Sequence, residues 1–196
     1  MQTGLGRLGR YPWGFSHQEA VPDIVVLGKP VGNGYPIGVV ITRREIAEAF
    51  ATGMEFFSTF GGSTVACAAG LAVLEVLEKE QLADNAERVG AHILRGLERL
   101  KASHPVIGDV RGVGLFLGVD LTCPDYTPAT EAAAYIVNRL RDHRILIGSD
   151  GPDNNVLKIR PPLCFSEDDA TALLRTLEII LDEIPLKQLA EPNNTD

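Results

Sequence analysis

The spacing of apolar residues from about residue 83 onward limits the possible folds more than any other feature of the sequence. Val89, Ile93 and Leu97 recur at the spacing of one face of a helix. In Leu115–Leu121, every second residue is leucine or valine, which is the period of a half-buried strand. Helical and strand patterns continue to alternate toward the C-terminus, which predicts a compact α/β unit.

Capping residues indicate where three helices of this unit begin. Asp84-Asn85 is expected to cap the first, and Thr127-Pro128 to open the second, because proline suits a first helical turn. Ser166 is expected to cap the last helix, with Asp169 at capping-box spacing. The polar tail from Glu191 is expected to be disordered. The expected strands are Val106–Val110, Gly114–Leu121, Ile145–Ile147 and Val156–Ile159.

The first third of the chain is rich in glycine and proline and holds only two strand-like runs. Asp23–Leu27 and Ile37–Ile41 are separated by the turn-rich segment Gly28–Pro36, and a helical pattern follows from Ser63 to about Glu80. Two strands cannot bury a core by themselves. We therefore expect further residues upstream that complete this part of the fold.

Composition argues against several classes of function. A formal net charge of −8 opposes binding to nucleic acid or an anionic membrane, and the sequence contains no apolar run long enough to span a bilayer. The three scattered cysteines favour free, buried thiols in a reducing compartment, and the four histidines lack metal-ligand spacing. The start of the chain has no apolar signal-peptide core. We expect a cytoplasmic protein without a metal.

Lys29 is the residue of greatest chemical interest. It follows the strand-like run Asp23–Leu27, and strand exits that feed flexible loops are where α/β sheets place ligands. A lysine amine becomes a Schiff-base nucleophile in partly apolar surroundings, which Ile24–Leu27 and Pro36-Ile37 could supply. On position alone, a lysine here is more often a solvated surface charge than a catalytic group. A nucleotide loop at Gly28–Gly34 is a weaker alternative, because the glycine spacing does not match.

Five segments in order resemble the class III aminotransferase family, whose members use pyridoxal phosphate. Pro22–Lys29, followed by Gly-x-Gly-x-Pro-Ile-Gly at residues 32–38, resembles the signature around the family's cofactor lysine. Ser58–Ser63 resembles the segment that crosses the family's dimer interface. The remaining segments are Gln2–Arg7, Val110–Leu115 and Pro161–Leu163.

The resemblance implies a fold and a domain organisation. The chain would be the α/β C-terminal part of a fold type I pyridoxal-phosphate-dependent transferase. Residues 1–70 would be the end of an incomplete cofactor-binding large domain, and residues 71–196 the linking helix and the small α/β domain. The whole enzyme would be a homodimer that shares its sites across the interface and acts on a small-molecule amine.

The resemblance also implies roles for three residues of the first third. Lys29 would form the Schiff base with the cofactor and later move protons on the substrate carbon. Gln2 would lie near the cofactor's phenolic oxygen, although a plain polar residue at a strand end is an equal alternative. Thr59 would donate its hydroxyl to the cofactor phosphate of the neighbouring subunit. The helix start at Ser63 favours an anion there, and Ser63 can cap the helix at the same time.

The chain departs from the family pattern in two ways. Lys158 stands where many members have an arginine that grips the substrate carboxylate, and lysine lacks the bidentate fork. Arg160, two residues on, is expected to point to the opposite face and to be a poor substitute. The family's aspartate for the pyridine nitrogen and its phosphate cup would precede Gln2. A non-catalytic fragment therefore stays an alternative, and we expect this chain alone to be inactive.

Four segments also resemble the phospho-lyase branch of the family, which acts on phosphoethanolamine or 5-phosphohydroxylysine. Members of this branch expel phosphate instead of transferring the amine. Lys158 and Arg160 would then be candidates for holding an anionic group, with solvated strand charges as the alternative. The expected function is an aminotransferase-like enzyme for a primary amine, with phosphate elimination as the alternative reaction. The four segments are Lys79–Leu82, Pro128–Tyr135, Ser149–Pro152 and Asn155–Phe165.

Overall fold

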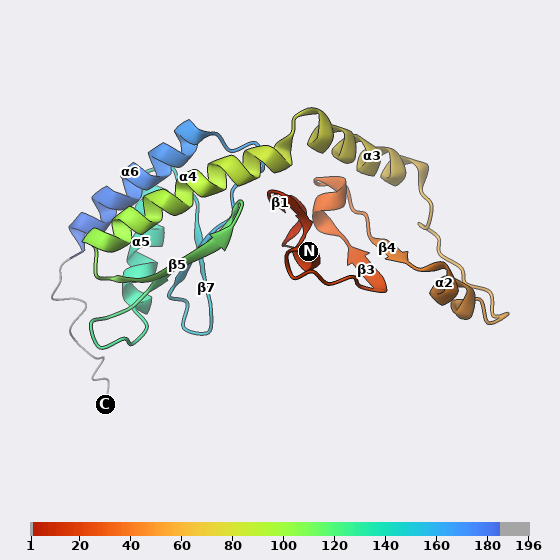
Figure 1. The fold of residues 1–196 in the computed structure, drawn as a ribbon, viewed down its shortest axis with the longest axis horizontal. Helices are drawn as coiled ribbons and strands as arrows, with labels where there is room; N and C mark the ends of the chain where they lie inside the picture. The colour runs from red at the N-terminus through yellow and green to blue at the C-terminus, as the bar shows by residue number, and fades with distance from the viewer. Residues whose placement is uncertain (1, 185–196) are drawn as a thin grey trace. The chain divides into compact units, whose positions relative to one another are not determined.

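The computed structural model describes residues 2–184 of the chain, which divide into two compact units between Ala83 and Asp84 (Figure 1). The tail from Glu191, expected to be disordered, lies outside the described residues. No helix within residues 2–184 combines the length and the apolar character needed to span a membrane.

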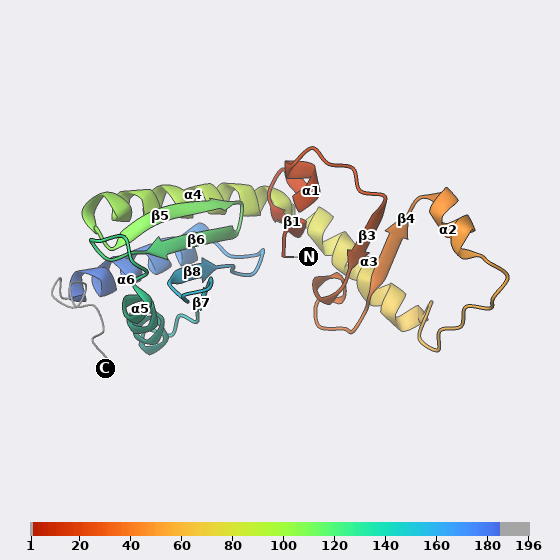
Figure 2. The same ribbon diagram turned by 90° about the horizontal axis from the view of Figure 1, so that it is seen from below.

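The second unit is built on a four-stranded antiparallel sheet with helices packed on one face. The strands lie in the spatial order β5-β6-β8-β7, so that β6 is paired on both sides (Figure 2). The strands are β5 (Ile107–Val113), β6 (Phe116–Leu121), β7 (Gly148–Asp150) and β8 (Val156–Ile159). The helices are α4 (Leu82–Ser103), α5 (Thr130–Asp142) and α6 (Glu167–Glu183).

Side-chain alternation in β6 separates the buried face of the sheet from its open face. Leu117, Val119 and Leu121 are buried against the helices, whereas Gly118 and Asp120 are half-buried on the other side. Burying each such leucine or valine contributes about 1.5–3 kcal/mol. The predicted α/β alternation in this unit is confirmed, and it leaves one sheet face available for polar residues.

Two predicted helix starts are wrong because Asn85 and Pro128 make contacts outside the helices that they were expected to begin. α4 begins at Leu82, so Asn85 lies in its first turn, where the Asn85 side-chain amide donates to the carbonyl oxygens of Leu163 and Phe165. α5 begins at Thr130 rather than near Pro128, because Pro128 forms an isolated bridge with Thr122 beside the sheet.

The strand predicted at Ile145–Ile147 is also displaced. The backbone N–H of Ile145 donates to the carbonyl oxygen of Leu140 at the end of α5, and Ile145 packs against the core. The strand that pairs with β8 is the next segment, β7. The apolar run Ile145–Ile147 is therefore a connection that packs against the core. The strand that pairs with β8 begins after this run, at Gly148.

The N-terminus of α6 has the predicted capping box. The Ser166 hydroxyl accepts a hydrogen bond from the backbone N–H of Asp169, and the Asp169 carboxylate accepts from the Ser166 N–H and hydroxyl. The hydrogen bond from the Ser166 side chain lowers the pKa of Asp169. The carboxylate's part of the box is therefore present at neutral pH and is lost as the pH falls through that lowered value.

Replacing Ser166 with alanine is expected to lower the free energy of unfolding by about 1 kcal/mol, because the Asp169 N–H loses its acceptor and the Asp169 carboxylate loses the hydroxyl donor. Urea unfolding followed by circular dichroism measures this loss. Thr176→Ala is the matched control, since the Thr176 hydroxyl only donates to the Ala172 carbonyl within the same helix. Equal stabilities of the Ser166 and Thr176 variants would contradict the capping role.

The first unit contains two separate two-stranded sheets and the helix α3. β3 and β4 pair antiparallel and confirm the two predicted strand-like runs to within two residues, and Ser63 caps α3 as expected. The strands are β1 (Gly4–Leu8), β2 (Tyr11–Trp13), β3 (Ile24–Leu27) and β4 (Val39–Thr42). The helices are α1 (Gly14–His17), the 3-10 helix η1 (Lys29–Gly32), α2 (Arg44–Phe50) and α3 (Thr64–Lys79).

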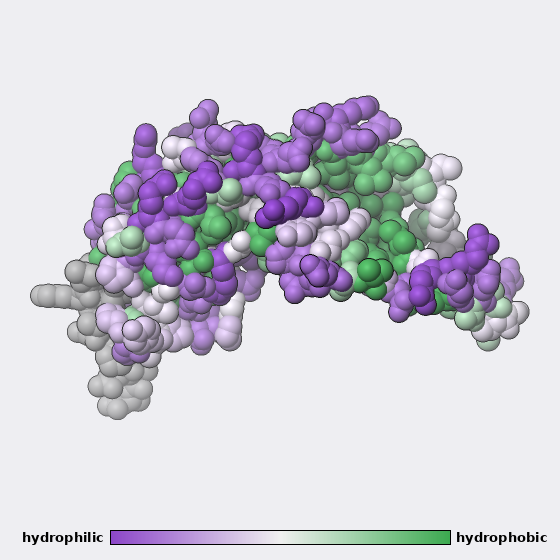
Figure 3. All heavy atoms as spheres, viewed as in Figure 1, coloured by the Kyte–Doolittle hydropathy of each residue, from purple (hydrophilic) through white to green (hydrophobic). Residues whose placement is uncertain are grey.

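Apolar side chains of the first unit remain largely uncovered. Val26 in β3 and Val40 in β4 are 68% and 66% exposed, and Leu71 on α3 is 61% exposed. Figure 3 shows a continuous hydrophobic area over α3 and these strands. An exposed apolar surface of this kind is typical of a region that contacts other protein.

The cysteines and histidines show no metal cluster within the described part of the chain. All three cysteines are free, but Cys67 and Cys164 are exposed, so the predicted burial of the thiols is wrong for these two. Cys67 lies on the exposed side of α3, and Cys164 lies in the turn before α6.

Candidate functional site

Lys29 lies at the point where β3 ends and η1 begins. Its backbone φ of +37° is in the left-handed region, which costs a residue with a side chain about 1–3 kcal/mol. The turn is held by the Val31 N–H, which donates to the Gly28 carbonyl oxygen over 3.2 Å, and Val31 is buried. The surrounding structure thus imposes an unfavourable conformation on Lys29, which is a feature of functional positions.

The side chain of Lys29 is exposed in this unit. The sequence predicted partly apolar surroundings from Ile24–Leu27 and Pro36-Ile37. Within the described residues those segments leave the lysine open to solvent, while Ile37 packs beneath the turn near Gly32. The amine is therefore accessible for covalent attachment to a ligand.

The N-terminus of α3 is a second polar feature of the first unit. The Ser63 hydroxyl accepts from the Ala66 N–H over 3.4 Å, and the Gly61 N–H donates to the Ser58 hydroxyl over 3.1 Å. Thr59 is exposed in the turn that leads into the helix. The first N–H groups of any helix have no partner within the helix, so this start is suited to an anion.

α3 also packs against the segment that carries Lys29. A Cβ built at Gly70 would lie 3.6 Å from Ile37 Cδ1 and 3.8 Å from Val31 Cγ1. The helix and the turn after β3 are therefore parts of one packed assembly. Gln2, the third residue predicted near the cofactor, is exposed in the turn before β1.

Lys158 lies on the open face of the sheet in the second unit. It faces Gly118 across β6 and Gly148 across β7, so neither neighbour places a side chain beside it. Its Nζ forms an ion pair with Asp150 Oδ2, one step diagonally along β7. The hydrogen bond from Lys158 lowers the pKa of Asp150, which keeps this carboxylate ionised at neutral pH.

A cavity of about 300 Å³ opens beside Lys158 and is lined by residues of β5, β6, β7 and β8. Arg111, the other cation in its wall, lies 2.7 Å from Asp109 and 3.2 Å from Asp120. The hydrogen bond between Arg111 and Asp109 lowers the pKa of Asp109 and raises that of Arg111. Both cations of the cavity wall therefore have carboxylate partners on this chain.

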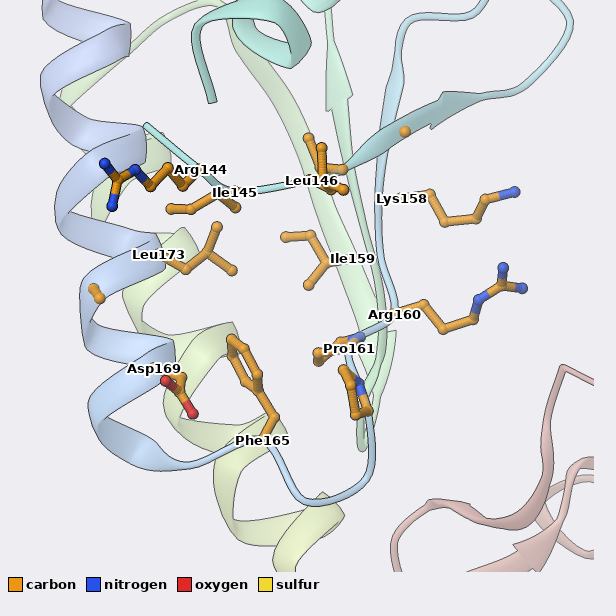
Figure 4. A pocket seen from close by; sticks show the side chains of 14 residues that line it. Arg144, Ile145, Leu146, Lys158, Ile159, Arg160, Pro161, Phe165, Asp169 and Leu173 are labelled. Atoms are coloured by element: carbon orange, nitrogen blue, oxygen red, sulfur yellow. The ribbon is translucent and has the colours of Figure 1, made fainter. Parts of the chain in front are cut away.

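Arg160 lies just beyond the end of β8 and is exposed. Figure 4 shows its side chain pointing to the same side as that of Lys158, away from the apolar groove that contains Ile159 and Leu173. The prediction of opposite faces was wrong, because alternate residues along a strand share a face. Arg160 is also close enough to Asp150 to contribute to the lowering of its pKa.

The predicted site residues thus fall into two groups. Gln2, Lys29 and Thr59 belong to the first unit, and Lys158 and Arg160 lie together on one side of the second unit. Asp150 was not singled out from the sequence as a site residue. The signal available for it was its place in Ser149–Pro152, one of the segments with a phospho-lyase resemblance.

Comparison with known proteins decides the family. The aminotransferase class-III family profile matches residues 1–181. This chain belongs to the class III aminotransferases. The membership confirms the predicted α/β fold as part of a fold type I enzyme.

Two curated relatives and two solved structures illustrate the range of this aminotransferase family. "Alanine–glyoxylate aminotransferase 2-like" of Drosophila melanogaster is 43% identical over 194 residues, covering 97% of this chain and 39% of that protein. "Ethanolamine-phosphate phospho-lyase homolog 1" of Caenorhabditis elegans is 42% identical over 188 residues, covering 92% and 40%. This class III chain thus spans about two-fifths of the length of these relatives.

Among solved structures, a phospholyase from Arthrobacter in complex with phosphoethanolamine superposes with a TM-score of 0.91 and 40% identity, covering 94% of this chain and 44% of that one. An amine transaminase from an uncultivated Pseudomonas species, described as PLP-bound, has a TM-score of 0.81 and 32% identity, covering 93% and 43%. Solved enzymes named for different reactions therefore share the fold of this chain.

Proposed function

We propose that the protein carrying this chain is a pyridoxal-phosphate-dependent enzyme that acts on a phosphorylated primary amine and releases phosphate. The observation that carries the reaction is Lys158, a compact cation beside a cavity on the open face of the sheet. A bidentate arginine suits a planar carboxylate, whereas a lysine serves as a point charge for phosphate. The likeness to the phosphoethanolamine-bound phospholyase supports the same reaction.

The residues of the first unit fit the cofactor. The exposed Lys29 amine would hold it covalently, and the Thr59 hydroxyl and the N–H groups at the start of α3 would donate to the phosphate of the neighbouring subunit's cofactor. When bound, pyridoxal phosphate acts as an electron sink for the substrate carbon. Lys29 would remove the proton from that carbon, and Lys158, together with Arg160, would attract the substrate's anionic group. Thr59 would serve the site of the partner subunit in a homodimer.

A substrate panel tests the proposed reaction. With phosphoethanolamine and water, the protein is expected to release inorganic phosphate, ammonia and acetaldehyde in equal amounts, without a keto acid. Colorimetric phosphate and coupled ammonia assays measure the products. 5-Phosphohydroxylysine is the second substrate of the panel. Amine transfer to a keto acid with no phosphate released would overturn the proposal.

Amine transfer is the second candidate, because the Drosophila relative bears an aminotransferase name at 43% identity. In that case the same Lys29 would serve, and only the group held at Lys158 would differ.

The third candidate is that the 196-residue chain by itself is not catalytic. Adding pyridoxal phosphate to the purified chain and recording its visible absorbance tests this, since a tight stoichiometric complex would oppose it. The domain division at residues 70/71, the homodimer and the cytoplasmic location stay predictions.

A further inference from the structure

The carboxylate of Asp150 is held in one orientation toward Lys158. Its Oδ2 forms the ion pair with Lys158 Nζ, and its Oδ1 accepts from the Gly151 N–H over 3.0 Å. Gly151 has a φ of +88°, a left-handed conformation that suits glycine in this turn. Because Gly148 lies directly opposite Lys158, the diagonal neighbour Asp150 is the side chain of β7 that Lys158 reaches.

The same pair lines the cavity of about 300 Å³ on the open face of the sheet. Arg111 in the cavity wall is already engaged by Asp109 and Asp120. Lys158 is more enclosed than its partner, with 27% of its side chain exposed against 57% for Asp150. An anion that enters the cavity therefore meets Lys158 together with a fixed negative charge, and either Asp150 must release the lysine or the anion must share it.

We propose that Asp150 is a positioning residue that sets how strongly Lys158 binds an anionic substrate group. This inference deepens the proposed function and rests on it, because it takes Lys158 as the ligand of that group. Asp150 holds the ammonium over the cavity, and its charge opposes an anion that approaches Lys158. A phosphate monoester therefore gains the attraction of Lys158 and bears the repulsion of Asp150, so this pair limits how tightly the group is held.

The test compares binding of inorganic phosphate by the full protein and by variants, using isothermal titration calorimetry at low ionic strength. In Asp150→Asn the opposing charge is lost while the side-chain shape is kept. We expect phosphate to bind roughly three- to tenfold more tightly, the range for one partly screened charge at contact distance. Asp153→Asn is the matched control, because it removes the same charge in the same turn and lies outside the cavity wall. Its effect is expected to be under about twofold.

The double variant Asp150→Asn, Lys158→Ala makes the result specific. Loss of the gain in the double variant supports the proposal, since the gain then acts through Lys158. A gain that persists without Lys158, an equal gain in Asp153→Asn, or no change in Asp150→Asn would overturn it. Phosphate that fails to bind any variant would also overturn it. The phosphate affinity is measured without turnover, so this test does not depend on which reaction the protein catalyses. Failure of the proposed phosphate release and failure of the role of Asp150 would therefore be separate results.

Discussion

Replacing Lys29 with alanine is expected to abolish turnover in the protein that carries this chain, lowering kcat by about a thousandfold or more. Lys29 would supply both the covalent anchor of the cofactor and the base for the substrate proton, so one substitution removes two functions. Its strained φ of +37° at the exit of β3 marks Lys29 as a position where the surrounding structure imposes the backbone conformation. Steady-state kinetics with the preferred amine measures the loss.

Borohydride reduction of the cofactor-loaded protein, followed by peptide mapping, locates the attachment site independently of activity. The pyridoxyl label is expected on Lys29. Lys79→Ala is the control variant, because Lys79 lies at the exposed end of α3 in an ion pair with Glu75 and should keep full activity. A label found on Lys79 or Lys158 would defeat the assignment of Lys29.

Replacing Gly90 with alanine is expected to lower the free energy of unfolding of the second unit by at least about 3 kcal/mol. A Cβ at this position would lie 2.1 Å from the carbonyl oxygen of Gly114 and 2.8 Å from its Cα. These atoms belong to the backbone of the turn between β5 and β6, so no change of side-chain rotamer can relieve the clash. α4 would have to move off the sheet and open the core around the fully buried Val89 and Leu115. Urea unfolding measures the loss.

Two other helical glycines serve as controls, which separate the effect of a clash with backbone from the general effect of replacing glycine in a helix. Gly96→Ala is expected to cost less, because the nearest atoms are the terminal methyl carbons of Leu174, which can shift. Gly70→Ala in α3 should be neutral or stabilising by up to about 1 kcal/mol, since alanine favours helix and its nearest neighbour lies at an ordinary 3.6 Å. If Gly90→Ala were as stable as the original protein, the close approach of α4 to the turn would be wrong.

The sequence by itself determined the features that depend on neighbouring residues in the chain. The alternation in Leu115–Leu121 predicted a half-buried strand, and Ser166 with Asp169 predicted the capping box, because side-chain period and capping bonds are local. The five ordered segments between Gln2 and Leu163 predicted the family, which the match over residues 1–181 confirms. The individual roles of Lys29, Gln2 and Thr59 stay predictions.

Only the tertiary structure decided the features that depend on residues distant in the chain. On the side of β8 away from β6, the pairing strand proved to be Gly148–Asp150 and not the more apolar Ile145–Ile147, because the end of α5 binds the Ile145 backbone. The same pairing sets Asp150 diagonally across from Lys158 and leaves both on the open face of the sheet. An apolar pattern records which residues avoid water, but strand register depends on hydrogen bonds between segments whose relative positions are established only when the chain is folded.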